Sequence, residues 1–374
     1  MSSENKNIYK LFFGLTAILL VAYLVLTLKE NHDLAGWILT LSLLSLAVVF
    51  RGYKVLKGMA FTIVIFSTVS VAMYHPEYFQ EWSGYKLSNL IIPLIQIIMF
   101  GMGTSMSLKD FAGVIKTPKG VAIGVLSQFL IMPLLGFTLA NVSGFSPEIA
   151  AGLVLIGCSP SGLASNVMSY LAKANLALSL TITAITTLIA PFVTPVLMKF
   201  LAGALVEIDV TKMMWDIIKM IIIPIGAGLI FNKLLSGKSK WLDKAMPIVS
   251  MIGIAFILTI ITAAGRDSLL KIGPLLILFV VIHNLCGYFL GYWSGRLLKM
   301  PEAACRTVAL EVGMQNAGLA SGIAKEMGKI ATVGLAAVVF GPLMNITGSI
   351  LASWWHGKPP KDNSGDKKKS ETTS

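Results

Sequence analysis

Long apolar runs alternate with short polar segments along almost the whole sequence. Each run covers about 17 to 25 residues, which is enough for an α-helix to cross a hydrocarbon core of roughly 30 Å. The pattern predicts an all-α polytopic membrane protein. The twelve predicted spans lie near residues 8–28, 34–50, 58–74, 88–107, 120–141, 148–170, 175–203, 213–235, 246–264, 272–298, 303–325 and 331–355.

The composition excludes the soluble classes. Hydrophobic residues make up 55% of the 374 residues, charged residues make up 13%, and the mean hydropathy is +0.79. An ordinary soluble domain is roughly one quarter charged. The net charge of +12 comes from basic residues in short loops, without a basic face or an aromatic-interleaved patch, so no nucleic-acid partner is expected.

The distribution of Lys and Arg predicts the orientation in the membrane. When the twelve spans are counted, 21 of these residues fall on the side of the N-terminus and 8 on the opposite side. Basic loops are typically retained in the cytoplasm, so both termini are predicted to be cytoplasmic, in the inner membrane of the cell. The tail 358–374 is basic and has no large apolar residue, which predicts a disordered cytoplasmic segment.

An internal repeat divides the chain. The sequence SGLAS at 161–165 recurs as AGLAS at 317–321, and the same offset places Gln128 on Asn284. Five spans separate the two copies, so equivalent helices cross in opposite directions, as in inverted-repeat transporters. The predicted organisation is an extra helix pair in 1–57 and a ten-helix core in 58–357, with repeats at about 58–203 and 213–357.

Polar residues at membrane depth concentrate in two of the predicted spans. Pro160 and Gly162 interrupt one span within Gly157–Asn166, and a second polar, Gly-containing stretch runs from Glu311 to Gly318. Backbone groups freed by such interruptions need a cavity, an ion or neighbouring protein as a partner. The pattern therefore predicts two broken helices, related by the repeat.

A third group of polar residues lies on intact spans. Ser179 and Thr183 share one helix face at i and i+4, and Gln128 lies on an earlier span. Glu311 is the one carboxylate predicted deep in the bilayer, with no basic residue evidently placed to neutralise it. Hydroxyl, amide and carbonyl oxygens with one carboxylate suit an alkali cation. The alternative is a protonated Glu311 hydrogen-bonded in a packed interface.

The N-termini of the two half-helices would favour an anionic substrate group near the break. No nucleophile, acid–base pair or phosphate-binding loop accompanies these residues, so the chain is predicted not to be an enzyme.

Four motifs give the chain a resemblance to a known family. FGMGTSMSLKDF, GVLSQFLIMP, GCSPSGLASNVMSYLAKANLALSLTITAITTLIAP and EVGMQNAGLAS stand in the order and spacing of the bile acid:sodium symporter (BASS) family, particularly its bacterial members. The likeness runs from about residue 58 to 355. It implies a ten-helix core, split into a panel and a core domain, in which the two broken helices cross.

The resemblance also implies two sodium sites. One would be formed by Ser165, Asn166, Ser179, Thr183 and Glu311. The other would be formed by Gln128, Glu311, the carbonyls of Val312 and Met314, and Gln315.

The candidate substrate cavity departs from the family pattern. Its candidate residues are Ser161, Leu163, Asn316 and Asn345. Family members often carry Thr at the position of Leu163, and His where Met344 precedes Asn345. The family name therefore does not define the substrate.

The hypothesis with most support is Na⁺-coupled symport of a small organic anion by alternating access. Candidate substrates are pantoate-like acids, 2-oxo acids and bile-acid-like carboxylates. One alternative is a proton-coupled or sodium-independent exporter on the same scaffold, for example of an oxyanion such as arsenite. A non-transporting membrane sensor or a channel is the other alternative.

Overall fold

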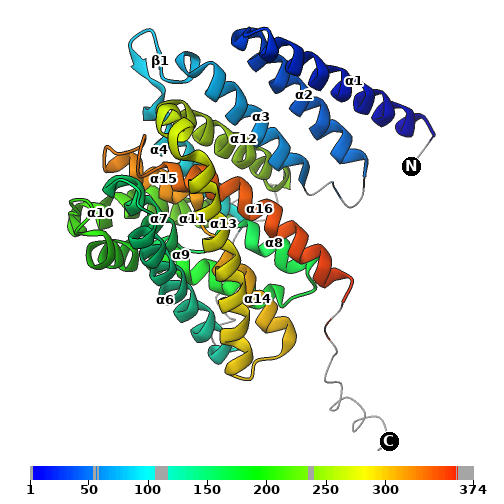
Figure 1. Ribbon diagram of the computed structural model, residues 1–374. Helices are drawn as coiled ribbons and strands as arrows, with labels where there is room; N and C mark the ends of the chain where they lie inside the picture. Colours follow the sequence, from blue (N-terminus) through cyan, green and yellow to red (C-terminus); the bar gives the residue numbers. More distant parts are fainter. Residues whose placement is uncertain are drawn as a thin grey trace, which may run out of the picture.

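The computed structural model describes residues 3–53, 56, 59–105, 117–234, 240–358 and 360, and nearly every element in them is a helix (Figure 1). The predicted all-α polytopic membrane protein is thereby confirmed. The helices are α1 (Ser3–Leu28), α2 (His32–Gly52), α3 (Ala60–Tyr74), α4 (Ile91–Ser105), α6 (Pro118–Val142), α7 (Pro147–Cys158), α8 (Ala164–Leu171), α9 (Leu176–Ala202), α10 (Val210–Ile217), α11 (Ile223–Leu234), α12 (Lys240–Ala264), α13 (Arg266–Leu297), α14 (Glu302–Gly313), α15 (Ala317–Glu326) and α16 (Leu335–His356).

Short elements connect some of these helices. A π-helical turn, η5 (Ile218–Ile222), joins α10 to α11 without a break. Between α3 and α4 lie two 3₁₀ turns, η2 (Pro76–Phe79) and η3 (Leu87–Leu90), and an antiparallel hairpin of β1 (Glu81–Trp82) and β2 (Tyr85–Lys86). In the hairpin Glu81 is paired with Lys86 and Trp82 with Tyr85.

Eight helical segments in the described ranges are long and apolar enough to cross a membrane in one piece. The other four predicted spans correspond to shorter pieces. Spans 148–170 and 303–325 are each divided into two short helices, α7 with α8 and α14 with α15. Span 58–74 gives the 15-residue α3, and span 246–264 coincides with the apolar part of α12. A criterion of length alone misses a span that is interrupted halfway.

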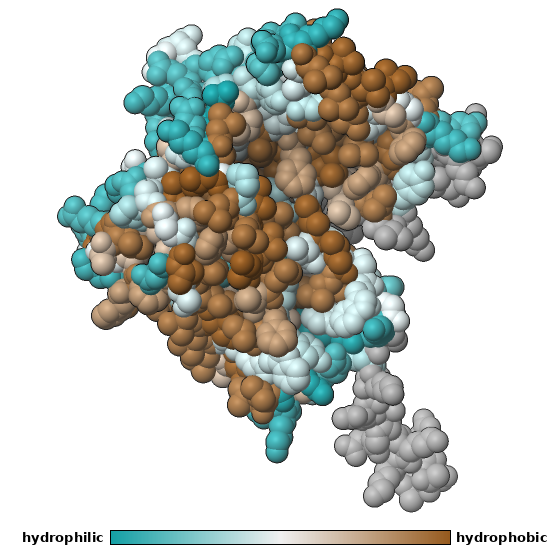
Figure 2. All heavy atoms as spheres, in the orientation of Figure 1, coloured by the Kyte–Doolittle hydropathy of each residue, from teal (hydrophilic) through white to brown (hydrophobic). Residues whose placement is uncertain are grey.

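The surface fits a bilayer environment. On the face shown in Figure 2, hydrophobic residues cover a broad central zone and hydrophilic residues gather toward the ends of the helices. Leu11, Phe200 and Phe289 are among the large apolar side chains exposed on the outside. Such exposure would be costly in water and costs nothing against lipid chains.

The helices pack in two groups. We call α3, α4, α11 and α12 the flanking helices, because α4 packs on α11 and α12, and α12 packs on α3. We call α6–α9 and α13–α16 the site bundle. At its centre, α7 is buried over all of 149–158 and α14 over all of 304–313. These two fully enclosed half-helices carry the first parts of both predicted breaks.

Helices α1 and α2 extend the flanking helices at one edge (Figure 1). Helix α1 packs against α2, which packs against α3. Small hydroxyl side chains connect them: Thr16 Oγ1 donates to Ser45 Oγ at 2.9 Å, and Ser67 Oγ donates to the carbonyl of Thr40 at 2.9 Å. Small polar residues of this kind allow close helix packing in a membrane.

Two predictions concern residues outside the described part of the chain. The boundary between the extra pair and the core falls at residues 57 and 58, and the disordered tail beyond Lys358 includes only Pro360 among the described residues. Both stay predictions.

A close approach of α4 and α11 gives a stability prediction. A Cβ atom at Gly103 would overlap the backbone carbonyl of Ile225, whereas a Cβ at Gly226 on α11 would meet no atom within 4 Å. We expect Gly103→Val to lower the free energy of unfolding by about 1–3 kcal/mol more than the matched Gly226→Val, because overpacking against backbone cannot relax. Melting temperatures of the two detergent-purified variants test this, and equal losses would contradict it.

Candidate sodium site

The two helix breaks lie against each other and satisfy each other's backbone groups. Ser161 and Gln315 form an isolated antiparallel β-bridge. The amide of Gly162 donates to the carbonyl of Met314 at 2.8 Å, and the amide of Asn316 donates to the carbonyl of Pro160 at 2.9 Å. Groups that would be unpaired in a membrane interior are thereby paired across the two breaks.

Gly162 is required for this approach. A Cβ atom at position 162 would lie 2.7 Å from the carbonyl oxygen of Gln315, which is closer than real Cβ contacts allow. Pro160 has no amide hydrogen, so it leaves no unpaired donor at the same point. The sequence therefore places the two residue types that tolerate a broken, closely approached backbone where the breaks meet.

The Glu311 carboxylate lies directly beside this junction and is fully buried. Its Oε1 atom accepts from Ser165 Oγ at 2.7 Å and from Ser179 Oγ at 2.5 Å, and its Oε2 atom accepts from Thr183 Oγ1 at 2.8 Å. Asn166 Oδ1 completes the group at 2.9 Å from Ser179 Oγ and 3.2 Å from Thr183 Oγ1. All five residues predicted for the first sodium site are thus in contact.

The close oxygen–oxygen contacts around Glu311 outnumber the protons that are available to form hydrogen bonds in them. Each of the three hydroxyls lies within hydrogen-bond distance of at least two other oxygens: Ser165 also approaches the carbonyl of Gly162 at 2.8 Å, Ser179 and Thr183 both approach Asn166 Oδ1, and the hydroxyls of Ser165 and Thr183 lie 3.4 Å apart. A hydroxyl has one proton to donate. More than half of these close oxygen–oxygen contacts therefore lack a proton, and protonating Glu311 would add only one. A cation at the centre would satisfy the remaining lone pairs, and hard oxygen ligands suit Na⁺.

The residues predicted for the second sodium site form a different arrangement. Gln128 Nε2 donates to the carbonyl of Ser159 and to Gln315 Oε1, both at 2.8 Å. Gln315 Nε2 donates to the carbonyl of Val312 at 2.6 Å and to Gln128 Oε1 at 3.3 Å. Both amides are fully buried, and their donors and acceptors match. This set is complete without an ion.

The carbonyl of Met314 has a partner as well, because it accepts from the amide of Gly162. Within the described residues, the Glu311 carboxylate accepts hydrogen bonds from the hydroxyls of Ser165, Ser179 and Thr183, and no hydrogen bond joins it to the two glutamines. Glu311 is therefore placed with one of its two predicted groups.

At each break, a side-chain amide donates a hydrogen bond to a backbone carbonyl at the end of the first half-helix. Gln128 donates to Ser159 beyond α7, and Asn284 Nδ2 on α13 donates to the carbonyl of Gly313 at the end of α14 at 2.8 Å. These are the two residues that the sequence repeat equates. Asn284 in turn accepts from Thr347 Oγ1 at 2.6 Å, a support from α16 that nothing in the sequence pattern indicated.

The four candidate substrate residues are more dispersed. Ser161 is buried and donates to the backbone carbonyl of Glu311 at 3.0 Å, so it belongs to the junction of the breaks. Leu163 is exposed, and half-buried Asn316 caps α15 by accepting from the amide of Leu319 at 3.0 Å. Asn345 lies on α16, one turn beyond the point where Gly341 meets α15, and donates to the carbonyl of Gly341 at 2.9 Å.

A cavity of about 290 Å³ lies elsewhere, between the α9–α10 connection, α10 and the end of α15. Its lining combines apolar side chains with the charged residues Asp209, Lys212 and Glu326, and Lys212 Nζ lies 2.9 Å from Asp216 Oδ2. None of the four candidate substrate residues lines it.

Comparison with known proteins identifies the family. The model described as "Sodium Bile acid symporter family" matches residues 92–272. The "Uncharacterized sodium-dependent transporter YocS" of Bacillus subtilis (strain 168) is 39% identical over 282 residues, which cover 75% of this chain and 87% of that protein. The chain belongs to the sodium bile acid symporter family.

Other relatives in this family come from distant organisms. "Probable sodium/metabolite cotransporter BASS1, chloroplastic" of Oryza sativa subsp. japonica is 31% identical over 311 residues, or 82% of this chain and 74% of its own length. The "Ileal sodium/bile acid cotransporter" of Oryctolagus cuniculus is 34% identical over 246 residues, or 63% of this chain and 69% of its own length. Family membership confirms the predicted multi-pass membrane transporter and makes the chain a transporter rather than an enzyme.

The junction of the breaks gives the second prediction. We expect Gly162→Ala to push the two breaks apart, because the new methyl group would overlap the carbonyl of Gln315, and to cost about 1–3 kcal/mol of stability. Gly318→Ala is the matched control, since a Cβ there meets its nearest atom at an ordinary 3.5 Å. Thermal unfolding in detergent measures both, and a control that is as destabilised as Gly162→Ala would count against the junction.

Proposed function

We propose that this chain is a Na⁺-coupled symporter that takes up a small organic anion by alternating access. The observation that carries the proposal is the excess of oxygen acceptors around the buried Glu311 carboxylate. A cation resolves both the shortage of protons and the buried negative charge, whereas a carboxyl proton resolves only the charge. Na⁺ is the ion named for the family and for several relatives.

The proposed substrate is a carboxylate of modest size, such as a pantoate-like acid or a 2-oxo acid, with bile-acid-like carboxylates as larger candidates. One relative is named for bile acid and another for a metabolite in general, which supports an organic acid without selecting one. The N-terminus of α15 at Asn316 carries the positive end of the helix dipole, which favours an anion. Leu163 and Asn345 are proposed to line the same cavity in the open protein.

A second sodium ion is proposed at Gln128, Gln315, Glu311 and the carbonyls of Val312 and Met314. The two glutamines occupy each other's hydrogen-bonding groups, so this site requires their side chains to rotate and turn their oxygens toward the ion. We propose that this rotation accompanies a change of conformation. The first site is then the one already assembled.

The remaining organisation is proposed from the sequence. The core of 58–357 consists of two inverted repeats, at about 58–203 and 213–357, in which the flanking helices α3, α4, α11 and α12 act as a panel against the moving site bundle. Residues 1–57 are proposed to add a helix pair, and the tail 358–374 is proposed to be disordered beyond Lys358, whose carbonyl accepts from Arg306. Both termini are proposed to face the cytoplasm, with the protein in the inner membrane.

Glu311→Gln tests the ion assignment. The neutral amide keeps the volume and some hydrogen bonds but removes the charge that attracts Na⁺, so we expect the variant to insert and fold without Na⁺-specific stabilisation. At 100 times the dissociation constant, Na⁺ should stabilise the wild-type protein by about 2.7 kcal/mol relative to K⁺ at equal ionic strength. Melting temperatures in the two salts report the difference.

Glu326→Gln, a carboxylate at the partly exposed end of α15, is the control and should respond to Na⁺ like the wild type. A Glu311→Gln protein that keeps the full Na⁺ response would rule out the site. Uptake of a carboxylate library into proteoliposomes that is insensitive to Na⁺ at fixed pH would instead favour a proton-coupled or sodium-independent exporter.

Ser179→Ala tests the hydroxyl ligands. The substitution removes one neutral oxygen ligand of the cation and leaves the carboxylate in place. The Na⁺ concentration that gives half-maximal stabilisation should therefore rise about tenfold. Ser169→Ala is the matched control, because Ser169 on α8 is equally buried but has no hydrogen-bond partner for its hydroxyl among the described residues. A titration of melting temperature with NaCl compares them, and equal shifts would contradict the assignment.

A further inference from the structure

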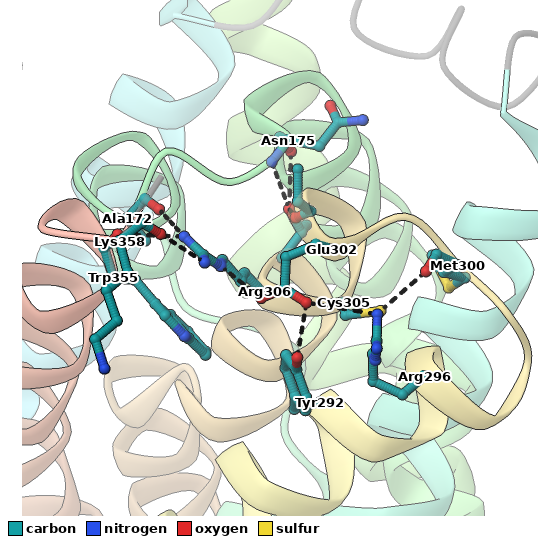
Figure 3. Close-up of polar contacts among 12 residues, drawn as sticks. Ala172, Asn175, Tyr292, Arg296, Met300, Glu302, Cys305, Arg306, Trp355 and Lys358 are labelled. Atoms are coloured by element: carbon teal, nitrogen blue, oxygen red, sulfur yellow. Dashed lines mark hydrogen bonds and ion pairs between the residues drawn. The ribbon is translucent and has the colours of Figure 1, made fainter. Parts of the chain in front are cut away.

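A buried arginine lies on the same half-helix as Glu311, five residues before it. Arg306 is one of the basic residues that lie near the end of a predicted span, yet its side chain is only 6% exposed. A guanidinium ion in such a position is costly unless its donors are used. Figure 3 shows it reaching from α14 toward Ala172 and Lys358, with Trp355 beside it.

The guanidinium of Arg306 donates hydrogen bonds to three backbone carbonyls. Its Nη1 atom donates to the carbonyls of Ala172 and Trp355, both at 3.2 Å, and its Nη2 atom donates to the carbonyl of Lys358 at 2.8 Å. Ala172 is the C-cap of α8, and Trp355 belongs to the last turn of α16. Carbonyls at helix C-termini lack intrahelical partners and favour a cation, so one guanidinium satisfies two helix ends.

Neighbouring side chains hold the guanidinium in this orientation. Glu302, one turn earlier on α14, accepts from Arg306 Nε at 2.9 Å and also accepts from the hydroxyl of Tyr292 at 2.7 Å. The ring of Trp355 lies 5.5 Å from the guanidinium carbon (Figure 3). Arg306 is therefore fixed on several sides.

The next residue ties α14 to another helix. The backbone amide of Asn175 donates to Thr307 Oγ1 at 2.9 Å. Asn175 is also the N-cap of α9, where its side chain accepts from the amide of Leu178 at 3.1 Å. Thr307 thus connects α14 to the first turn of α9.

Helices α14, α8 and α9 also meet at the cation site. Glu311 on α14 contacts Ser165 on α8 and Ser179 and Thr183 on α9. Residue 306 lies about 7.5 Å along the helix axis from residue 311. The polar contacts at 306 and 307 therefore fix the spacing of α14 from α8 and α9 at one level, and the cation ligands lie at the next level.

We propose that Arg306 is a positioning residue for the cation site: its fork of hydrogen bonds to Ala172, Trp355 and Lys358 sets the distance of the Glu311 carboxylate from the hydroxyl of Ser165. The inference rests on the proposed sodium site. An ion that is selected by the size of its oxygen cage depends on such spacing, because a small shift of one helix lengthens several ion–oxygen distances together. Lys cannot replace Arg here, since a single ammonium group cannot reproduce the planar fork.

The test is a Na⁺ titration of thermal stability, at constant ionic strength with K⁺, for four detergent-purified proteins. These are the wild type, Arg306→Lys, Arg306→Gln and Arg296→Gln. Arg296 is the control because it is half-exposed, lies 3.7 Å from Glu302 and makes no hydrogen bond to α8 or α16 within the described residues. A fall in melting temperature that is the same in Na⁺ and in K⁺ reports a loss of structural stability. A change in the Na⁺ concentration that gives half-maximal stabilisation, the Na⁺ midpoint, reports a change at the cation site.

We expect both Arg306 variants to raise the Na⁺ midpoint about tenfold, as loss of an outer support of a metal site usually does, and Arg296→Gln to leave it unchanged. A Na⁺ midpoint unchanged in Arg306→Lys would overturn the positioning role, and this variant keeps the charge that folding requires. An equal rise of the Na⁺ midpoint in Arg296→Gln would also overturn it, since loss of any positive charge in the cluster would then have the same effect. A wild type without any Na⁺-specific response would instead remove the proposed function on which the inference rests.

Discussion

The burial of one carboxylate is the constraint on which this structure depends. Glu311 is enclosed on all sides, and within the described residues its hydrogen-bond partners are hydroxyl groups rather than a basic side chain. Ionised carboxylates are rarely stable without compensation at such a place. The two helix breaks make the compensation possible, because they bring Ser165 and Asn166 from one half of the chain against Glu311 from the other.

The breaks themselves are stable because each completes the other. Gly162 and Asn316 donate to carbonyls of the opposite break, while Gln128 and Asn284 hold the ends of the preceding half-helices. Backbone groups that the breaks leave unwound at membrane depth are therefore paired across the junction at Gly162 and Asn316. The same pairing holds Ser165 on α8 and Glu311 on α14 at a fixed separation, so the backbone contacts of the breaks also set the geometry of the candidate site.

Much of this could be predicted from the sequence, and the limits are physical. Hydropathy predicted twelve spans, and Pro160 and Gly162 revealed a break, because both act through local backbone rules. Ser179 and Thr183 were found by their spacing on one helix face. Arg306 and Thr347 could not be recognised in the same way, since their partners are backbone carbonyls or amides far away in the chain. The self-pairing of Gln128 with Gln315 depends on side-chain rotamers that no pattern of residue types determines.

The chemistry around Glu311 also determines how the site responds to voltage. Its hydroxyl partners are neutral, so with Glu311 ionised the proposed site would carry one negative charge without Na⁺ and none with one Na⁺ bound. A membrane potential acts with about 2.3 kcal/mol per 100 mV on each elementary charge that crosses the whole membrane, and not at all on a neutral pair. In the proposed transporter, the electrical work of this site would therefore fall on its unoccupied form, and the loaded site would move without opposing the field.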